Sequence, residues 1–244
     1  MRVLIAIPVY NEEKYVERVL GRVLAQGHDV LVIDDGSTDA TAAIAGRMPV
    51  RLIQREQNVG YGRSIRDAFT YAISHGYDWL ITMDCDEQHE PDAIPEFLAE
   101  AAAGGFDVIS GSRYLARFRG DDDPPADRRA INGIITKEIN ERLGLNLTDS
   151  FCGFKAYRVA SLSRLHLTEN GYAQPMQFWV QAKAAGMRIK EIPVKLIYND
   201  PTRTFGGPLN DADVRLAHYR DVFEREIACW KAGAACRQTC GCRA

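Results

Sequence analysis

The sequence predicts an α/β protein whose mainly parallel central sheet is covered by helices on both faces. Short apolar runs alternate with segments of helical spacing through the first hundred residues, and this alternation requires crossover connections between parallel strands. The runs are continuously apolar, as expected for strands that are buried on both faces. With 244 residues, of which 46% are hydrophobic, the chain has enough apolar material for one large core.

The N-terminal half accounts for most of the predicted sheet. Strands are expected at residues 3–7, 29–33, 50–53, 78–83 and 106–110. Helices are expected between them at residues 12–25, 40–45, 60–75 and 91–103. Pro8 should end the first strand because proline has no N–H to donate to a sheet. Ser37, Thr38 and Asp39 precede the second helix and are of the residue types that cap helices.

The C-terminal half is less regular. Residues 113–127 are rich in charge, glycine and proline and are expected to form a mobile loop. Helices are predicted at residues 131–143, 174–185 and 211–230, and a turn followed by a short strand at residues 149–157. Two further short strands are predicted at residues 188–192 and 194–198. We find no internal repeat and expect one domain over residues 1–208, followed by a helix and a cysteine-rich tail over 209–244.

Charge and hydropathy exclude several classes of protein. The 30 Lys and Arg residues and 33 Asp and Glu residues give a net charge of −3, which argues against a nucleic-acid-binding protein because such proteins present a basic face. The longest stretch without Asp, Glu, Lys or Arg is residues 170–182, too short for a membrane-spanning helix. The N-terminus shows no signal-peptide pattern. We therefore expect a cytoplasmic protein.

Six cysteines are unevenly distributed. Cys85 and Cys152 lie in apolar or motif segments, whereas Cys229, Cys236, Cys240 and Cys242 lie near the C-terminus. Reduced thiols in a mobile tail are expected, because a disulfide framework is typical of exported proteins. A zinc cluster is the alternative, although the spacing matches no standard ligand pattern and the tail has no histidine.

Polar clusters follow three of the predicted strands directly. They read Tyr10-Asn11-Glu12, Asp34-Asp35-Gly36-Ser37 and Asp84-Cys85-Asp86. Ligands of open parallel sheets lie beyond the carboxyl ends of the strands. We therefore expect the three clusters to meet in one pocket.

The residue types in these clusters suit a nucleotide and a metal ion. Asp84 and Asp86 could hold a divalent cation, which takes carboxylate oxygens together with substrate phosphates; the alternative is a pair of solvated turn residues. Asp35 could bind ribose or a base edge, or the segment could only cap the next helix. Tyr10 could stack on a nucleobase and Glu12 could accept a hydrogen bond from it, or both could belong to an ordinary loop.

Six segments form an ordered series along residues 1–205. They are Ile5-Ala6-Ile7-Pro8-Val9-Tyr10-Asn11-Glu12, Val32-Ile33-Asp34-Asp35-Gly36-Ser37-Thr38-Asp39, Asn58-Val59-Gly60, Asp84-Cys85-Asp86-Glu87-Gln88-His89-Glu90-Pro91, Gly111-Ser112-Arg113-Tyr114 and Asp149-Ser150-Phe151-Cys152-Gly153-Phe154-Lys155. The series resembles the inverting family 2 glycosyltransferases of GT-A type, and more closely their dolichyl- and polyprenyl-phosphate sugar synthases. The resemblance implies a GT-A catalytic domain.

The resemblance also implies roles for individual residues. Nucleotide-sugar binding falls to Pro8, Tyr10, Glu12, Ile33, Asp35, Asp84, Cys85, Asp86, Gln88 and Arg203. Among these, Asp84, Asp86 and Gln88 would hold Mg²⁺ or Mn²⁺, and Arg203 would contact the diphosphate. Arg113 and one of Arg128 or Arg129 would bind the acceptor phosphate. Asp86, Arg113 and Asp149 are the implied catalytic residues, with Asp149 acting either as general base or as an orienting group.

The implied reaction moves a hexose, mannose rather than glucose, from a GDP- or UDP-sugar to a polyprenyl or dolichyl phosphate. An ionised phosphate acceptor needs positioning more than deprotonation. One alternative is a transferase that acts on a sugar hydroxyl of a glycolipid or polysaccharide, for which Asp149 would be an essential base. Another is a non-catalytic subunit that binds nucleotide sugars.

The last predicted helix, residues 211–230, is amphipathic. Val214, Val222, Phe223 and Ile227 alternate with basic and acidic residues. The helix could lie on a membrane surface, which a lipid-linked acceptor would favour, or it could pack against the domain. A peripheral position at the cytoplasmic membrane face is therefore the alternative to a cytoplasmic protein.

Overall fold

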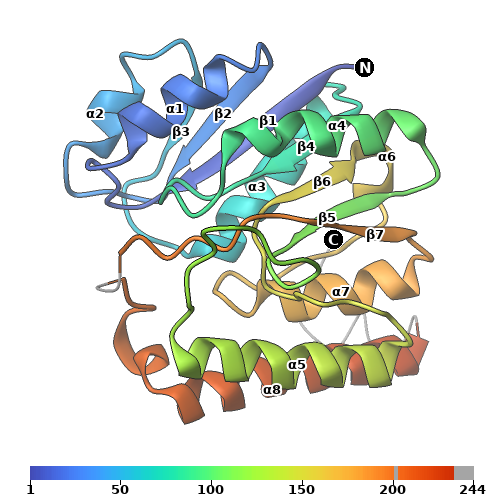
Figure 1. Ribbon diagram of the computed structural model, residues 1–244. Coiled ribbons are helices and arrows are strands. Elements are labelled where there is room, and N and C mark those ends of the chain that lie inside the picture. Colours follow the sequence, from blue (N-terminus) through green and yellow to red (C-terminus); the bar gives the residue numbers. More distant parts are fainter. Residues whose placement is uncertain (201–202, 234–244) are drawn as a thin grey trace.

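The computed structural model describes residues 1–200 and 203–233, and shows a seven-stranded sheet between two layers of helices (Figure 1). The strand order is β3-β2-β1-β4-β6-β5-β7. Six strands run parallel, and only β6 is antiparallel to its neighbours β4 and β5. The predicted fold class, mainly parallel with helices on both faces, is confirmed.

The strands match the predicted apolar runs closely. They are β1 (Val3–Val9), β2 (Asp29–Asp34), β3 (Arg51–Gln54), β4 (Trp79–Thr82), β5 (Val108–Ser112), β6 (Lys155–Arg158) and β7 (Ile189–Pro193). Strand β1 lies between β2 and β4: the chain runs from β1 to β2 and β3 on one side, and then crosses back to β4 on the other side. This reversal opens a crevice at the carboxyl ends of β1 and β4, the usual ligand position in such sheets.

The helices divide into two groups. One face of the sheet carries α1 (Val16–Leu24), α2 (Thr41–Ala45), η1 (Pro91–Ala93) and α4 (Ile94–Ala103). The other face carries α3 (Tyr61–Ser74), α5 (Ala126–Leu143), α6 (Val159–Leu162), α7 (Gln174–Ala184) and α8 (Ala212–Ala232), with η2 (Gly207–Asn210) leading into α8.

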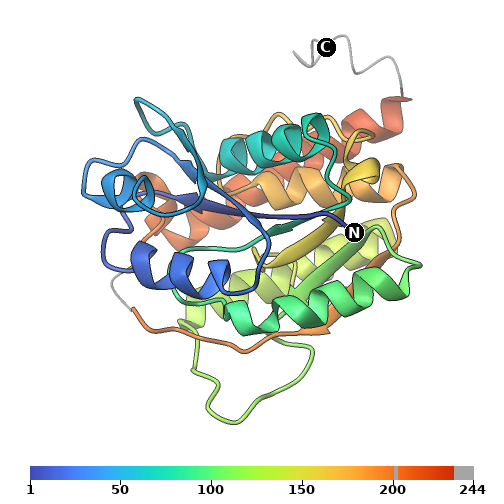
Figure 2. The same ribbon diagram turned by 90° about the horizontal axis from the view of Figure 1, so that it is seen from above.

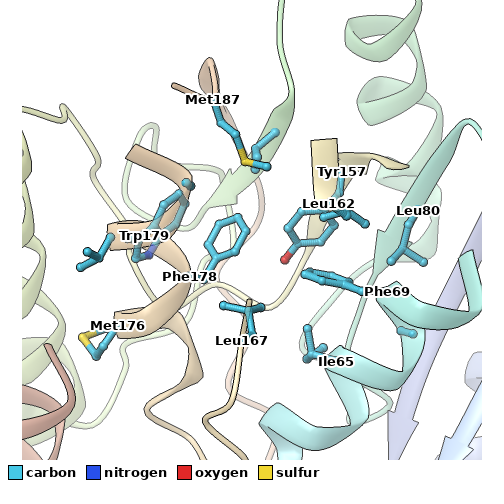
Figure 3. Packing of buried hydrophobic residues seen from close by; sticks show 14 of the residues in the cluster. Ile65, Phe69, Leu80, Tyr157, Leu162, Leu167, Met176, Phe178, Trp179 and Met187 are labelled. Atoms are coloured by element: carbon cyan, nitrogen blue, oxygen red, sulfur yellow. The ribbon is translucent and has the colours of Figure 1, made fainter. Parts of the chain in front are cut away.

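Alternate residues of β1 serve the two cores. Ile5 and Ile7 pack with α1 and α4, whereas Leu4 and Ala6 pack with α3 on the opposite face, as the period of two in a strand requires. The second core contains an aromatic chain in which Phe69 meets Tyr157 at 4.9 Å between ring centroids, and Tyr157 meets Phe178 at 5.5 Å (Figure 3). Two packed cores hold the strand ends rigidly in place.

Two local predictions are wrong. Strand β1 continues through Pro8 to Val9. It stays paired with β2 as far as Val9, whereas its pairing with β4 ends at Ala6, two residues before Pro8, so the missing N–H of Pro8 does not interrupt the pairing with β4. Residues 194–198 form no strand. Their backbone bonds instead to the acidic loop, where Asp121 accepts from the Leu196 N–H and Asp122 from the Tyr198 N–H. That loop, residues 113–125, has no regular element and projects from the body of the molecule (Figure 2).

Helix α8 packs against the domain, which favours the second of the two readings of this segment. It lies beside α5 and α7 and buries Tyr219, Val222, Phe223 and Ile227 (Figure 1). Among residues 1–200 and 203–233, no helix combines the length and apolar character that crossing a membrane requires. The tail cysteines beyond Cys229 lie outside the described residues, and the division at residue 208 stays a prediction.

Candidate active site

A cavity of about 640 Å³ opens where β1 and β4 end. Asp35 and Asp84 both line it, so the predicted meeting of the polar clusters is confirmed. The predicted site residues that line it are Pro8, Tyr10, Glu12, Asp35, Asp84, Cys85, Asp86, Gln88, Arg113, Arg128 and Arg203. Residues from both halves of the chain therefore form one site.

Three predicted site residues do not line the cavity. Ile33 is fully buried on β2 and belongs to the core beneath α3, so its side chain is not available to a nucleotide. Arg129 lies over the ring of Tyr114, 3.7 Å from the ring centroid. Asp149 is fully buried behind Arg113.

The carboxylates that follow β4 lie at the wall of the cavity. Burial raises the pKa of both Asp84 and Asp86, and their mutual proximity raises that of Asp86 further. The Tyr61 hydroxyl hydrogen-bonds to Asp84. A Cβ on Gly153 would lie 2.7 Å from Asp84 Oδ2, so only glycine allows the backbone to approach this carboxylate. The site is thus built closely around two acidic groups.

His89 supports this segment from behind. Its Nδ1 accepts the Asp84 N–H at 3.0 Å, and its Nε2 lies 3.9 Å from Cys152 Sγ. Burial lowers the pKa of His89 to about 4, so the imidazole is neutral near pH 7. Glu87, two residues earlier, has a positive φ of 61°, a rare conformation for its residue type. These features bend the chain so that Asp84 and Asp86 both reach the cavity.

An ion pair joins Glu12 to Arg203 on the same side of the cavity. Arg203 Nη1 donates to Glu12 Oε2 at 2.9 Å, and Arg203 Nε lies 3.6 Å from Asp86 Oδ2. Burial raises the pKa of Glu12, although Arg203 partly opposes the shift. Arg203 therefore lies among acidic groups and draws the segment that follows β7 onto the site.

The second ion pair, Arg113 with Asp149, lies at the end of β5. Arg113 Nε donates to Asp149 Oδ2 at 2.6 Å, and Nη2 donates to Oδ1 at 3.0 Å. The carboxylate also accepts the backbone N–H groups of Arg113 and Phe151 and the side-chain amide of Asn132. The arginine and these donors hold the pKa of Asp149 well below its usual range, against the opposing effect of burial.

Arg128 closes the cavity opposite the strands. Its guanidinium donates to the Arg203 carbonyl oxygen and lies 4.8 Å from the Phe205 ring centroid. Arg215, from α8, contacts the same ring at 4.5 Å. The segment that carries Arg203 is thus held by cation–π contacts.

Asp35 has many partners within the protein. It accepts the N–H groups of Val59 and Gly60 at 3.0 and 2.7 Å and pairs with Arg55. The carboxylate therefore fixes the loop before α3, in addition to lining the cavity.

Sequence reasoning missed several lining residues. Tyr61, Lys155 and Gln174 all line the cavity. Tyr61 follows the segment Asn58-Val59-Gly60 directly, and Lys155 is the last residue of the segment that begins at Asp149. Their place next to or within these motifs is the only sign of a site role that the sequence gives. Gln174 lies at the start of α7, with no motif around it.

The carboxylates at the end of β4 are candidate ligands for a metal ion. Across the described part of the chain, no three His, Cys, Asp or Glu side chains are arranged to hold one. Asp84 and Asp86 nevertheless place hard oxygen ligands at one cavity wall beside Gln88. This set fits a cation such as Mg²⁺ that takes one or two carboxylates and completes its shell with substrate phosphates.

Comparisons with known proteins agree with this geometry. Residues 4–165 match the family described as Glycosyl transferase family 2. The chain is 30% identical to an undecaprenyl-phosphate mannosyltransferase of Micrococcus luteus over 231 residues, covering 90% of this chain and 94% of that protein. It is 30% identical to a polyprenol monophosphomannose synthase of Mycolicibacterium smegmatis, covering 89% and 86% of the two chains.

A solved structure shares the fold. The glucosyl-3-phosphoglycerate synthase of Mycobacterium tuberculosis, crystallised with Mn²⁺, UDP and glucosyl-3-phosphoglycerate, superposes with a TM-score of 0.72 at 17% identity. The match covers 93% of this chain and 80% of that one. It establishes the GT-A-like architecture of the sheet and its helices.

Proposed function

The chain belongs to glycosyl transferase family 2, and on that premise we propose that it transfers mannose, rather than glucose, from a nucleotide diphosphate sugar to a polyprenyl or dolichyl phosphate. The observation that carries the proposal is one cavity that combines the carboxylates Asp84 and Asp86 with Arg113 and Arg128. The names of the two mannosyl-transferring relatives support both the sugar and the lipid phosphate.

The donor is assigned to the side of the cavity formed by β1, β2 and β4. Tyr10, which is half exposed at the end of β1, offers its ring to the base, and Asp35 lines the same cavity. Arg203 donates hydrogen bonds to the diphosphate in place of those it gives to Glu12. Mg²⁺ or Mn²⁺, held by Asp84, Asp86 and Gln88, would supply positive charge that stabilises the departing diphosphate.

The acceptor is assigned to Arg113 and Arg128. A phosphate monoester is ionised near neutral pH, so its oxygen attacks the anomeric carbon of the hexose with inversion and without losing a proton. The bond from that carbon to the diphosphate breaks, and its electron pair leaves with the nucleoside diphosphate. Arg113 uses Nε and Nη2 for Asp149, and we assign Nη1 to the acceptor phosphate. Positioning of this kind supplies much of the rate enhancement.

Asp149 acts in this scheme as a positioning residue. Its five hydrogen bonds and its lowered pKa make it a weak base. A hydroxyl acceptor would need a base within reach, so the geometry of Asp149 supports the phosphate acceptor over a sugar hydroxyl. A non-catalytic binding subunit would not need Arg113 to be held so firmly.

We also propose that the protein meets its acceptor at the cytoplasmic surface of a membrane. Leu115 and Phe118 are 44% and 41% exposed in the loop that starts beside Arg113, and Arg117 and Arg119 flank Phe118. Apolar and basic side chains together favour the interface of anionic lipids. Sedimentation with anionic vesicles, compared for wild type and Phe118→Ser, tests the contact; equal sedimentation would contradict it.

The decisive experiment is a turnover assay with matched acceptors. Polyprenyl phosphate and the corresponding polyprenol are each incubated with GDP-mannose, GDP-glucose, UDP-mannose or UDP-glucose, with Mg²⁺, Mn²⁺ or a chelator. We expect a lipid-linked mannose product only from the phosphate and only with metal. Product from the polyprenol, or an unchanged rate in chelator, would overturn the proposal. The nucleotide sugar that gives the higher turnover identifies the nucleobase, guanine or uracil, that the protein binds.

A further inference from the structure

The three glutamines of α7 differ in how their carboxamides are used. Gln177 accepts the N–H groups of Thr168 and Glu169 at 2.6 and 2.9 Å and donates to Glu226 at 2.9 Å. Gln181 accepts the His166 N–H and donates to the His166 carbonyl and to Glu226. Gln174 differs, because its Nε2 is buried and has no hydrogen-bond partner in residues 1–200 and 203–233.

A buried amide without a partner is costly in a folded protein. Gln174 is 5% exposed, the same as Gln177, so solvent does not hydrate its side chain freely. An unpaired donor in this setting is unfavourable because it has given up its hydrogen bonds to water, and native structures contain few of them. Gln174 also lines the cavity. Because Nε2 itself has almost no accessible surface, the amide must rotate toward the cavity before a ligand oxygen there can remove the cost.

The position of Gln174 is rigidly fixed. A Cβ on Gly62 would lie 2.8 Å from Gln174 Cβ and 2.5 Å from the Glu169 carbonyl oxygen, so α3 and the start of α7 touch through this glycine. Further along α7, Met176, Phe178 and Trp179 pack into the core (Figure 3). The backbone and Cβ of Gln174 are therefore fixed beside the cavity, and only rotation about its side-chain bonds can bring the amide to a partner.

The residues around Gln174 indicate which part of the nucleotide sugar would bind to this amide. Tyr61, the neighbour of Gly62, hydrogen-bonds to Asp84, so this wall adjoins the carboxylates assigned to the diphosphate. The lining residues next to Gln174 in the chain, Tyr172 and Pro175, are uncharged, and Tyr172 stacks on Tyr61 at 6.1 Å. An uncharged wall with an amide donor and an aromatic ring suits a neutral hydroxyl rather than a phosphate.

We propose that Gln174 donates a hydrogen bond from Nε2 to a hydroxyl of the hexose of the bound nucleotide sugar, and so helps to select the sugar. This inference rests on the proposed function, because it requires a nucleotide-sugar donor. A site built to hydrogen-bond a hydroxyl discriminates strongly against an analogue that lacks it. In this scheme Gln174 determines specificity for the sugar, although it belongs to none of the sequence motifs.

The test compares Gln174→Met with Gln177→Met by calorimetry, using GDP, UDP, GDP-mannose and UDP-glucose with Mg²⁺. Both substitutions keep side-chain length and remove the amide. We expect Gln174→Met to bind the preferred nucleotide sugar about tenfold more weakly, as loss of one hydrogen bond implies, with unchanged nucleoside diphosphate affinity and undiminished thermal stability. Gln177→Met should lose thermal stability while its ratio of nucleotide-sugar to nucleoside-diphosphate affinity stays at the wild-type value.

The other outcomes overturn the inference in distinguishable ways. An equal loss of affinity for nucleotide sugar and nucleoside diphosphate would place Gln174 at the nucleotide instead. Unchanged affinities in Gln174→Met would remove its role while leaving the proposed function intact. A wild-type protein that binds none of the nucleotide sugars would overturn both proposals together.

A second measurement uses donors that each lack one hydroxyl, and it needs only wild-type protein. One of these donors should bind about tenfold more weakly than the parent sugar nucleotide. If every deoxy donor binds as tightly as the parent, the inference is wrong even where the variant does not fold.

Discussion

The two ends of the cavity use the same chemical pair, an arginine with a carboxylate, and hold it differently. At the acceptor end Asp149 is fully buried, and Arg113 and Asn132 lower its pKa. At the donor end burial raises the pKa of Glu12, and Arg203 comes from a segment outside the sheet. The number of donors around the carboxylate decides the direction of the shift, because burial opposes ionisation in both cases.

This difference separates a fixed group from an exchangeable one. Arg113 follows β5 directly and is tied to Asp149 through two side-chain hydrogen bonds, so its remaining donors have a defined direction. Arg203 has a partly exposed side chain and a partner whose ionised form is disfavoured. A diphosphate can therefore compete for Arg203, whereas an acceptor phosphate meets an arginine that is already oriented.

The largest expected effect is at the donor end. Asp86→Asn should lower turnover with lipid phosphate on the order of 10³-fold, because it removes a charge that would hold the cation at the leaving group. Turnover at saturating donor and metal measures it. Asp92→Asn is the matched control, since Asp92 is an exposed carboxylate paired with Arg22, and it should leave turnover unchanged. Wild-type turnover in Asp86→Asn would exclude this role.

The next largest effect concerns the contribution of the Arg113–Asp149 pair to the stability of the fold. Asp149→Asn should lower the free energy of unfolding by about 3–5 kcal/mol, because it leaves Arg113 without its counter-charge in a buried site. Urea unfolding measures the change. Glu224→Gln breaks the exposed pair with Arg142 and should cost less than about 1 kcal/mol. Similar losses in the two variants would show that burial does not distinguish these pairs.

A dependence on pH should follow from the same carboxylate. The pKa of Asp149 lies below its ordinary value of 3.8 in the folded protein, so the stability it contributes is present above that value and is lost as the pH falls toward the folded pKa. Between about pH 5 and 3 the stability gap between wild type and Asp149→Asn should narrow by about 1 kcal/mol. Urea unfolding across this range checks it, and a constant gap would contradict the lowered pKa.

The smallest effect is expected from Glu12→Gln. Removing the charge should change the free energy of unfolding by less than about 1 kcal/mol, because ionised Glu12 bears a burial cost that offsets its attraction to Arg203. Thermal and urea unfolding both report it. A loss of unfolding free energy as large as that of Asp149→Asn would show that the Glu12–Arg203 pair stabilises the fold as much as the Arg113–Asp149 pair does, and the two ends would then not differ.

Much of the fold could be read from local pattern. Apolar runs and helical spacing located the strands to within a few residues, since each depends on neighbours in the chain. The meeting of Asp35 and Asp84 followed from the shared direction of parallel strands. The antiparallel course of β6 between β4 and β5 was out of reach, because pairing partners far apart in sequence leave no periodic signal.

Roles at the site needed more than residue types. Asp149 and Ile33 were both singled out from the sequence, yet neither lines the cavity. A carboxylate used as a base and one used to hold an arginine look the same in sequence; only the donors around Asp149 distinguish them. Gln174 stood in no motif, and its unpaired amide is visible only once its neighbours are placed.

The amino-acid order by itself determined the layered α/β architecture and the edge at which the acidic groups gather, because both arise from short-range periodicity. Tertiary structure alone decided which charges pair, which are buried and which remain for a substrate. Those properties depend on the distances and dielectric surroundings of side chains up to 191 positions apart, as for Glu12 and Arg203, and no local pattern encodes them.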